Sequence, residues 1–245
     1  MTADSAVSKN AGQADARLSL NRETSISPIP IMRLAGWTLT LGAASYIVLT
    51  LGGDVLGGQG SSHFTSPLYA PVSTLQAVAG FALVLGLTGH YARQHARTGR
   101  LGLVGFVPLV ASLALYAFAL PLMSALIFAW LAGQPAGRSL LGPNSGPPGL
   151  LLFFMISTVL NVVGIACYGI ATWRAGVFSK TAASVLIAGA ALALVGFVIG
   201  SSNENLPAWV SDLPGFVFIA ALGWLGLELG TQLNRPEVSD LGTSA

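Results

Sequence analysis

Long apolar runs, almost free of charged side chains, constrain this chain more than any other feature. A run of about 18 or more predominantly apolar residues is long enough to cross a bilayer as a helix. The chain contains six such runs, at residues 34–51, 72–91, 103–130, 150–173, 182–200 and 214–233. We therefore expect an all-α integral membrane bundle of six transmembrane helices over 34–233. A flexible cytoplasmic tail over 1–33 and a short cytoplasmic tail over 234–245 would flank it.

The third run is longer than one crossing requires. The uncharged stretch 101–133 would span about 50 Å as a helix, against a hydrocarbon core of about 30 Å. Two crossings and a turn do not fit into it. We therefore expect one tilted or kinked helix, bent near Pro108 or Pro121.

Positive charge alternates between the loops in the way expected for six crossings. With the N-terminus inside, only Arg138 falls in an outer loop. The cytoplasmic segments hold the other cations: Lys9, Arg17, Arg22, Arg33, Arg93, Arg97, Arg100, Arg174, Lys180 and Arg235. This bias predicts that both termini are cytoplasmic and that the protein lies in the inner (plasma) membrane.

Composition excludes several other classes of protein. Charged residues make up 8% of the chain and hydrophobic residues 53%, which argues against a soluble enzyme and against a disordered chain. A net charge of +2 argues against a nucleic-acid partner. Cys167 is the single cysteine, and hydrolase, zinc-protease and P-loop motifs are missing. We expect no enzymatic activity, no metal and no cofactor.

One hairpin resembles known sequences. Residues 173–180 read Trp-Arg-Ala-Gly-Val-Phe-Ser-Lys and precede an Ala/Gly-rich run. The segment 173–200 resembles a hairpin in several uncharacterised multi-span bacterial membrane protein families, with Ser179 where those families carry proline. The resemblance covers about 30 of 245 residues. It implies a bacterial inner-membrane protein and assigns no functional residue.

Glu228 is the one formally charged residue well inside a predicted span. A carboxylate at that depth is costly unless it is paired or protonated. It is either a proton carrier or cation ligand, or half of a structural ion pair with Arg235, Arg93 or Arg174. Asn161, near the middle of the fourth run, poses the same choice between lining a solute path and joining helices.

Charged groups are also expected at both membrane surfaces. We interpret Arg93, Arg97, Arg100, Arg174 and Lys180 as a cytoplasmic basic collar facing anionic lipid headgroups, with His90 beside it. On the outer side, Asp54, His63, Glu204 and Asp212 form either a solvated acidic rim or a shared site that binds a divalent cation or attracts a cationic substrate.

Pairs of small residues four positions apart complete the pattern. Gly226 with Gly230 and Gly196 with Gly200 allow close helix packing, within the chain or in a homo-oligomer or membrane complex. Together these features predict a non-enzymatic multi-pass scaffold or partner subunit whose first partner is the lipid bilayer. The alternative is a small-solute or proton-coupled transporter that uses Glu228 and Asn161.

Overall fold

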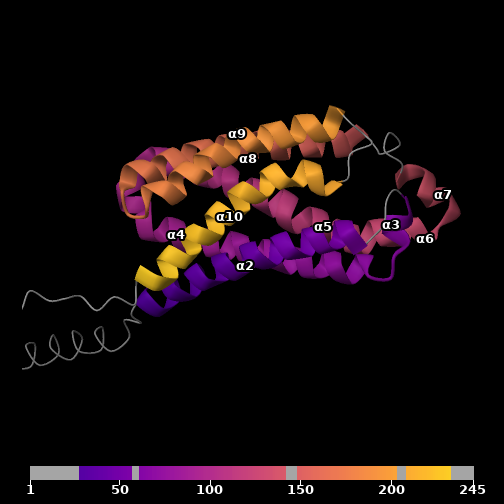
Figure 1. Cartoon of the computed structure of the whole chain (residues 1–245), viewed down its shortest axis with the longest axis horizontal. Helices are drawn as coiled ribbons and strands as arrows, with labels where there is room; N and C mark the ends of the chain where they lie inside the picture. Colours follow the sequence, from indigo (N-terminus) through magenta and orange to yellow (C-terminus); the bar gives the residue numbers. More distant parts are fainter. Residues whose placement is uncertain (1–27, 57–60, 142–147, 203–207, 233–245) are drawn as a thin grey trace, which may run out of the picture. The chain divides into compact units, whose positions relative to one another are not determined.

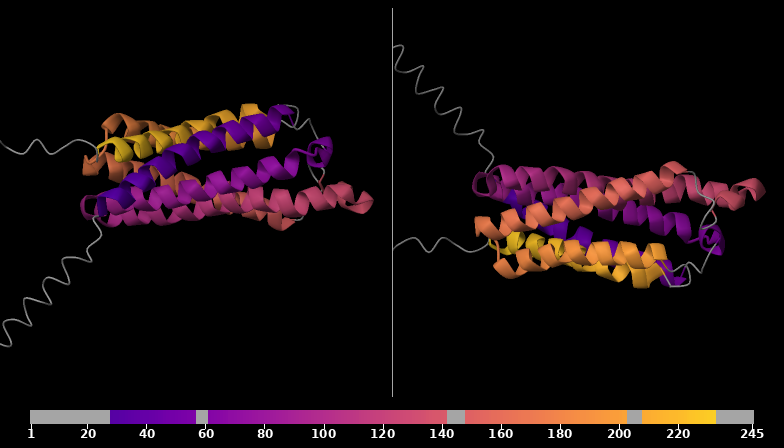
Figure 2. Two further views of the ribbon diagram at one scale, coloured as in Figure 1. Left: turned by 90° about the horizontal axis from the view of Figure 1, so that it is seen from below. Right: turned by 90° about the horizontal axis from the view of Figure 1, so that it is seen from above.

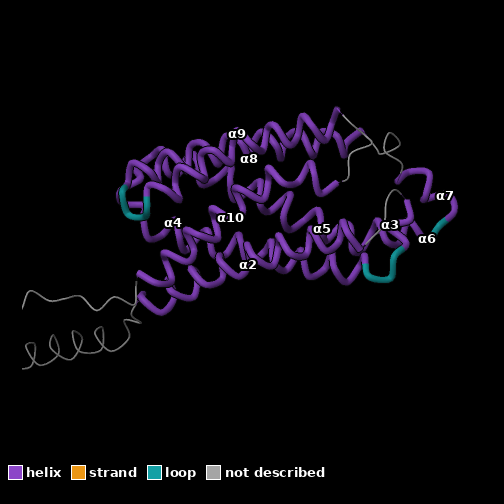
Figure 3. Tube along the Cα trace, in the orientation of Figure 1, coloured by secondary structure: helices purple, strands orange, loops and turns teal. Residues whose placement is uncertain are grey.

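The structure is a computed structural model that describes residues 28–56, 61–141, 148–202 and 208–232. Within these ranges the chain is helical with short connections, and it contains no strand (Figure 3). The expected all-α class is confirmed for this part of the chain. The described residues from Met32 onward form one compact unit, to which the following account refers. The expected tails, over 1–27 and 234–245, lie outside the described residues.

Helices fill almost all of the described chain. The longest are α2 (Pro28–Leu56), α4 (Tyr69–Ser112), α8 (Pro148–Ala175), α9 (Lys180–Ser202) and α10 (Ala208–Gln232). Shorter elements are α3 (Ser61–Thr65), the π-helix η1 (Leu113–Ala119), α5 (Leu120–Met123), the π-helix η2 (Ser124–Phe128), α6 (Ala129–Gly133), α7 (Pro135–Arg138) and the 3-10 helix η3 (Ser139–Leu141). By length and composition, four segments of the described chain could cross a membrane: one each in α2, α8 and α10, and the helical stretch Tyr69–Gly133. The apolar part of α9, Lys180–Gly196, is shorter.

The stretch Tyr69–Gly133 turns back on itself at Gly99. Gly99 has φ 57° and ψ −150°, a backbone conformation that glycine adopts without a Cβ clash. The ring of Phe81 lies 5.6 Å from that of Phe118, and the ring of Tyr91 lies 4.2 Å from that of Phe106. Both pairs are nearly symmetric about Gly99. Residues 69–98 and 100–133 therefore form two antiparallel helical rods, which Figure 2 shows side by side.

Close contacts at glycines show how the rods pack together. A Cβ at Gly86 would meet Leu39 of α2, one at Gly226 would meet Gly36 of α2, and one at Gly189 would meet Phe218 of α10. Because a Cβ at Gly42 would likewise meet Ala79, the contacts of α2 with the first rod of α4 run in opposite directions along the two helices, which are therefore antiparallel. Figure 1 shows the same alternation for the other consecutive rods. The core between them consists mainly of fully buried leucines, namely Leu39, Leu83, Leu87, Leu109, Leu186, Leu222 and Leu225.

This arrangement gives the bundle two distinct ends. At one, called here the Gly99 end, lie the reversal in α4, the turn between α8 and α9, and the contact of Gly36 with Gly230 near the end of α10. At the other, called the Asp54 end, α2 finishes, α10 begins, and α3 and α6 contact each other.

The helices extend beyond the predicted runs. α2 begins at Pro28, so residues 28–33 are helical although we predicted them as part of the tail. Proline suits the first helical position because its missing N–H needs no partner there. The third rod contains two π-helical stretches, η1 and η2, on either side of Pro121, and the bend predicted near Pro108 or Pro121 stays a prediction. Pro121 cannot donate to the carbonyl of Ala117, which removes one bond of the α-helical pattern.

Candidate functional site

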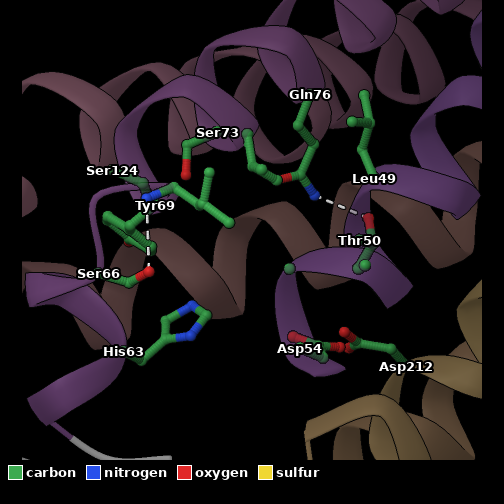
Figure 4. A pocket seen from close by; sticks show the side chains of 14 residues that line it. Leu49, Thr50, Asp54, His63, Ser66, Tyr69, Ser73, Gln76, Ser124 and Asp212 are labelled. Atoms are coloured by element: carbon green, nitrogen blue, oxygen red, sulfur yellow. Dashed lines mark hydrogen bonds between the residues drawn. The ribbon is translucent and has the colours of Figure 1, made fainter. Parts of the chain in front are cut away.

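A cavity of about 200 Å³ lies at the Asp54 end. Its walls come from α2, α3, the start of α4, η2 and the start of α10, so elements that are far apart in the sequence build it. The lining residues are Leu49, Thr50, Gly52, Gly53, Asp54, His63, Ser66, Leu68, Tyr69, Val72, Ser73, Gln76, Ser124 and Asp212. Figure 4 shows the polar side chains among them.

Two carboxyl groups face each other on one side of this cavity. Asp54, near the end of α2, and Asp212, near the start of α10, lie side by side in Figure 4. Both lie beyond the predicted spans, which end at residue 51 and begin at residue 214. Burial, reinforced by the charge of Asp54, raises the pKa of Asp212 to about 7. Burial also raises the pKa of Asp54, an effect that the nearby His63 reduces.

The carboxyl pair favours a bound proton or cation. Two carboxylates held close together away from bulk water repel each other, so the site is more stable when one of them is protonated or neutralised. The Oδ2 atom of Asp54 is buried and has no hydrogen-bond partner. No group of three or more His, Cys, Asp or Glu residues in the described part of the chain could hold a metal ion.

Hydrogen bonds hold the remaining walls of the cavity. The side-chain amide of Gln76 donates to Thr50 Oγ1 over 2.8 Å and so joins α4 to α2. The Tyr69 side chain bonds with those of Ser124 and Ser73, which joins α4 to η2. The cavity thus keeps its shape through side-chain bonds between helices. Sequence analysis grouped Asp54, His63 and Asp212 as an outer acidic set, and the structure places all three around one cavity; Glu204 lies outside the described residues.

Glu228 has a backbone partner. Its Oε2 atom accepts a hydrogen bond of 2.8 Å from the N–H of Ser179, in the turn between α8 and α9. The Ser179 hydroxyl in turn accepts from the N–H of Ala182 and so caps α9. Within the described chain, the partner of Glu228 is this backbone amide, whereas we considered Arg93 and Arg174 as partners in an ion pair. The third candidate, Arg235, lies outside the described residues.

Asn161 joins two helices. Its side-chain amide donates to Ser112 Oγ over 3.0 Å, linking α8 to α4. Asn161 lies fifteen residues before Gly176 along α8, which corresponds to roughly 22 Å of helix. Glu228, by contrast, contacts the turn beside Gly176. The two residues of the transport hypothesis therefore bond to different neighbours at different levels of the bundle.

The residues of the basic collar gather at the Gly99 end. Arg93, Arg97 and Arg100 flank the reversal in α4, Arg174 and Lys180 flank the turn between α8 and α9, and all five are exposed. The prediction for His90 was wrong. His90 is completely buried and does not face lipid headgroups.

A buried polar network surrounds His90. Its Nδ1 atom lies 2.6 Å from the Tyr168 hydroxyl, and its ring stacks on Phe178 at 4.1 Å. One turn further along, the amide of Gln94 donates to Thr172 Oγ1 over 2.9 Å. His90, Gln94, Tyr168 and Thr172 all have no exposed surface. Sequence analysis missed this network, although the four-residue spacing in each pair was visible.

Comparison of the chain with protein-family models, with curated protein sequences and with solved structures finds no match.

Proposed function

We propose that this chain is a six-span integral protein of the bacterial inner membrane, with both termini in the cytoplasm. It acts there as a non-enzymatic scaffold or partner subunit. The reversal at Gly99 supports the count, because it turns the longest apolar segment into two antiparallel rods. Six rods then alternate in direction. The positions of the exposed cations at the Gly99 end support the orientation.

The observation that carries the scaffold assignment is how the polar side chains within the bundle are bonded. Asn161 bonds to Ser112, Gln94 to Thr172, and Glu228 to the amide of Ser179. A solute path needs polar groups that face a hydrated channel, whereas these groups join helix to helix. They are better suited to holding the bundle together than to guiding a solute through it.

Partner contacts would use surfaces other than the Gly226–Gly230 pair. Both glycines pack inside the chain, against Gly36 and Trp37 of α2. From Leu152 to Val163 one face of α8 is apolar and exposed, through Leu152, Met155, Ile156, Val159 and Val163. This face would contact lipid, a second copy of the chain or another membrane protein.

Flux measurements in liposomes test this proposal. The purified protein would be reconstituted, and proton and alkali-cation fluxes would be followed with fluorescent indicators at several pH values. We expect rates equal to those of protein-free liposomes. A protein-dependent flux would overturn the scaffold assignment.

The second candidate function is a proton-coupled or cation transporter, and the cavity at the Asp54 end favours it. Asp54 and Asp212 supply a carboxyl pair there, and Glu228 and Asn161 would have to complete a path from a distance. The deciding variant is Asp212→Asn, which removes one charge. If the liposomes show flux and this variant abolishes it while still folding, the transporter assignment replaces the scaffold assignment.

A further inference from the structure

The Gly99 end carries positive charge that the described chain does not neutralise. Its exposed cations are Arg33, Arg93, Arg97, Arg100, Arg174 and Lys180. The carboxylate described at this end is Glu228, and it is already engaged by the N–H of Ser179. The other described carboxylates, Asp54 and Asp212, lie at the opposite end of the bundle. Among the described residues, this end is therefore electropositive.

Three of these arginines lie at the same level of the bundle. The Gln94–Thr172 bond and the contact of Gly105 with Tyr168 fix α8 against both rods of the α4 hairpin. Continuing both registers toward the turn brings Arg174 level with the reversal, between Arg97 and Arg100. A Cβ placed on Gly99 or on Gly176 would meet no atom within 4 Å, so the surface beside both turns is open.

Apolar and aromatic side chains border these cations. Leu103, Val104 and Val107 follow Arg100 along the second rod, and each is about half exposed, at 50%, 57% and 56%. Trp173 is 44% exposed, and the ammonium of Lys180 lies 5.6 Å from the centroid of its ring. Tryptophan favours the level of the lipid headgroups, so this pair holds a cation at that level.

We propose that the Gly99 end is a binding site for an anionic phospholipid. The phosphate contacts the guanidinium groups of Arg97, Arg100 and Arg174, and an acyl chain lies along the apolar surface after Arg100. Guanidinium groups suit phosphate because their parallel N–H donors match its oxygens. A soluble polyanion would not use the adjoining leucine and valines, which is why the surface fits a lipid. This inference rests on the proposed membrane location.

The test uses the full-length protein in detergent and in nanodiscs. Phosphatidylglycerol or phosphatidylcholine would be titrated in, and bound lipid would be counted by native mass spectrometry. We expect phosphatidylglycerol to bind more tightly, and high salt to weaken the preference. The triple variant Arg97→Gln, Arg100→Gln, Arg174→Gln should lose affinity for phosphatidylglycerol by on the order of tenfold or more. Arg138→Gln, a charge removed from α7 at the other end, should change nothing.

Three outcomes would overturn the proposal. They are equal binding of the two lipids, full affinity for phosphatidylglycerol in the triple glutamine variant, and binding of soluble glycerol phosphate as tight as that of phosphatidylglycerol. The corresponding triple lysine variant keeps the positive charge and should keep most of the affinity for phosphatidylglycerol. If the glutamine variant does not fold, the lysine variant still tests the proposal, because a loss of its preference for phosphatidylglycerol over phosphatidylcholine would contradict it. Failure to enter phosphatidylcholine nanodiscs at all would contradict the membrane location instead, which separates the two proposals.

Discussion

A partly buried carboxylate needs a partner, and Glu228 has the N–H of Ser179. Replacing it by alanine leaves that amide in the turn without its acceptor. We expect Glu228→Ala to lower the free energy of unfolding by about 1–3 kcal/mol. Thermal unfolding in detergent would measure this. Glu228→Gln keeps an acceptor oxygen and should lose less. An alanine variant as stable as wild type would mean that the bond does not hold the turn.

Asp212 should make stability depend on pH. Burial and the charge of Asp54 raise the pKa of Asp212 to about 7 in the folded chain. The pKa of an aspartate in an unfolded chain is about 3.9. Between these values the folded state holds a proton that the unfolded state has released, so this group's contribution to stability falls as pH rises. Above about pH 7 the contribution no longer changes.

The variant Asp212→Asn isolates that contribution. Its unfolding midpoint relative to wild type should rise between about pH 4 and pH 7 and then stay constant. Melting curves of both proteins in one buffer series would show this. A difference that is the same at every pH would contradict a raised pKa at Asp212.

At the scale of the element, the α4 hairpin depends on close approach of its two rods. A Cβ at Gly80 would collide with the backbone carbonyl of Ala117, which cannot move as a side-chain tip can. We expect Gly80→Ala to separate the rods and lower the free energy of unfolding by about 1–3 kcal/mol or more. Unfolding in detergent again provides the measurement.

A matched glycine controls this experiment. A Cβ at Gly53 would lie 3.6 Å from Val72 Cγ1, an ordinary contact. Gly53→Ala should therefore leave stability unchanged or raise it by up to about 1 kcal/mol, because alanine favours a helix more than glycine does. If both variants behaved alike, the packing of the hairpin would be looser than described.

The apolar runs predicted where the rods lie but not where the helices end. Residues 92–98 are polar and basic, and the sequence suggested a loop there; the helix nevertheless continues to the reversal at Gly99. Hydropathy reports the surroundings of a segment, whereas backbone bonding continues for as long as no residue interrupts it. The π-helical stretches of the third rod were also beyond prediction, because they depend on Pro121 and on packing against the neighbouring rod.

At the scale of the whole molecule, six spans predict which surfaces a membrane-impermeant reagent reaches. In a Cys167→Ser background, single cysteines at Leu68 and Leu140 should react with an impermeant maleimide in intact cells. Cysteines at Ala96 and Thr181, both exposed at the Gly99 end, should react only after the membrane is opened. Reaction of Ala96→Cys in intact cells would rule out the proposed orientation.

The candidate cavity shows the limit of sequence reasoning at this scale. Asp54, His63 and Asp212 could be recognised as an outer set of charges, but the sequence could not show that the end of α2 and the start of α10 lie together. That adjacency follows from helix packing along the whole bundle, through contacts such as that of Gly36 with Gly226. The partner of Glu228 was missed for the same reason, because a backbone amide carries no mark in the sequence.

The reversal at Gly99 also bears on how the chain is assembled. One residue joins two rods, so there is no spare chain between them. In a membrane, we therefore expect the two rods to insert together. A tag or domain inserted at this joint would part the two rods.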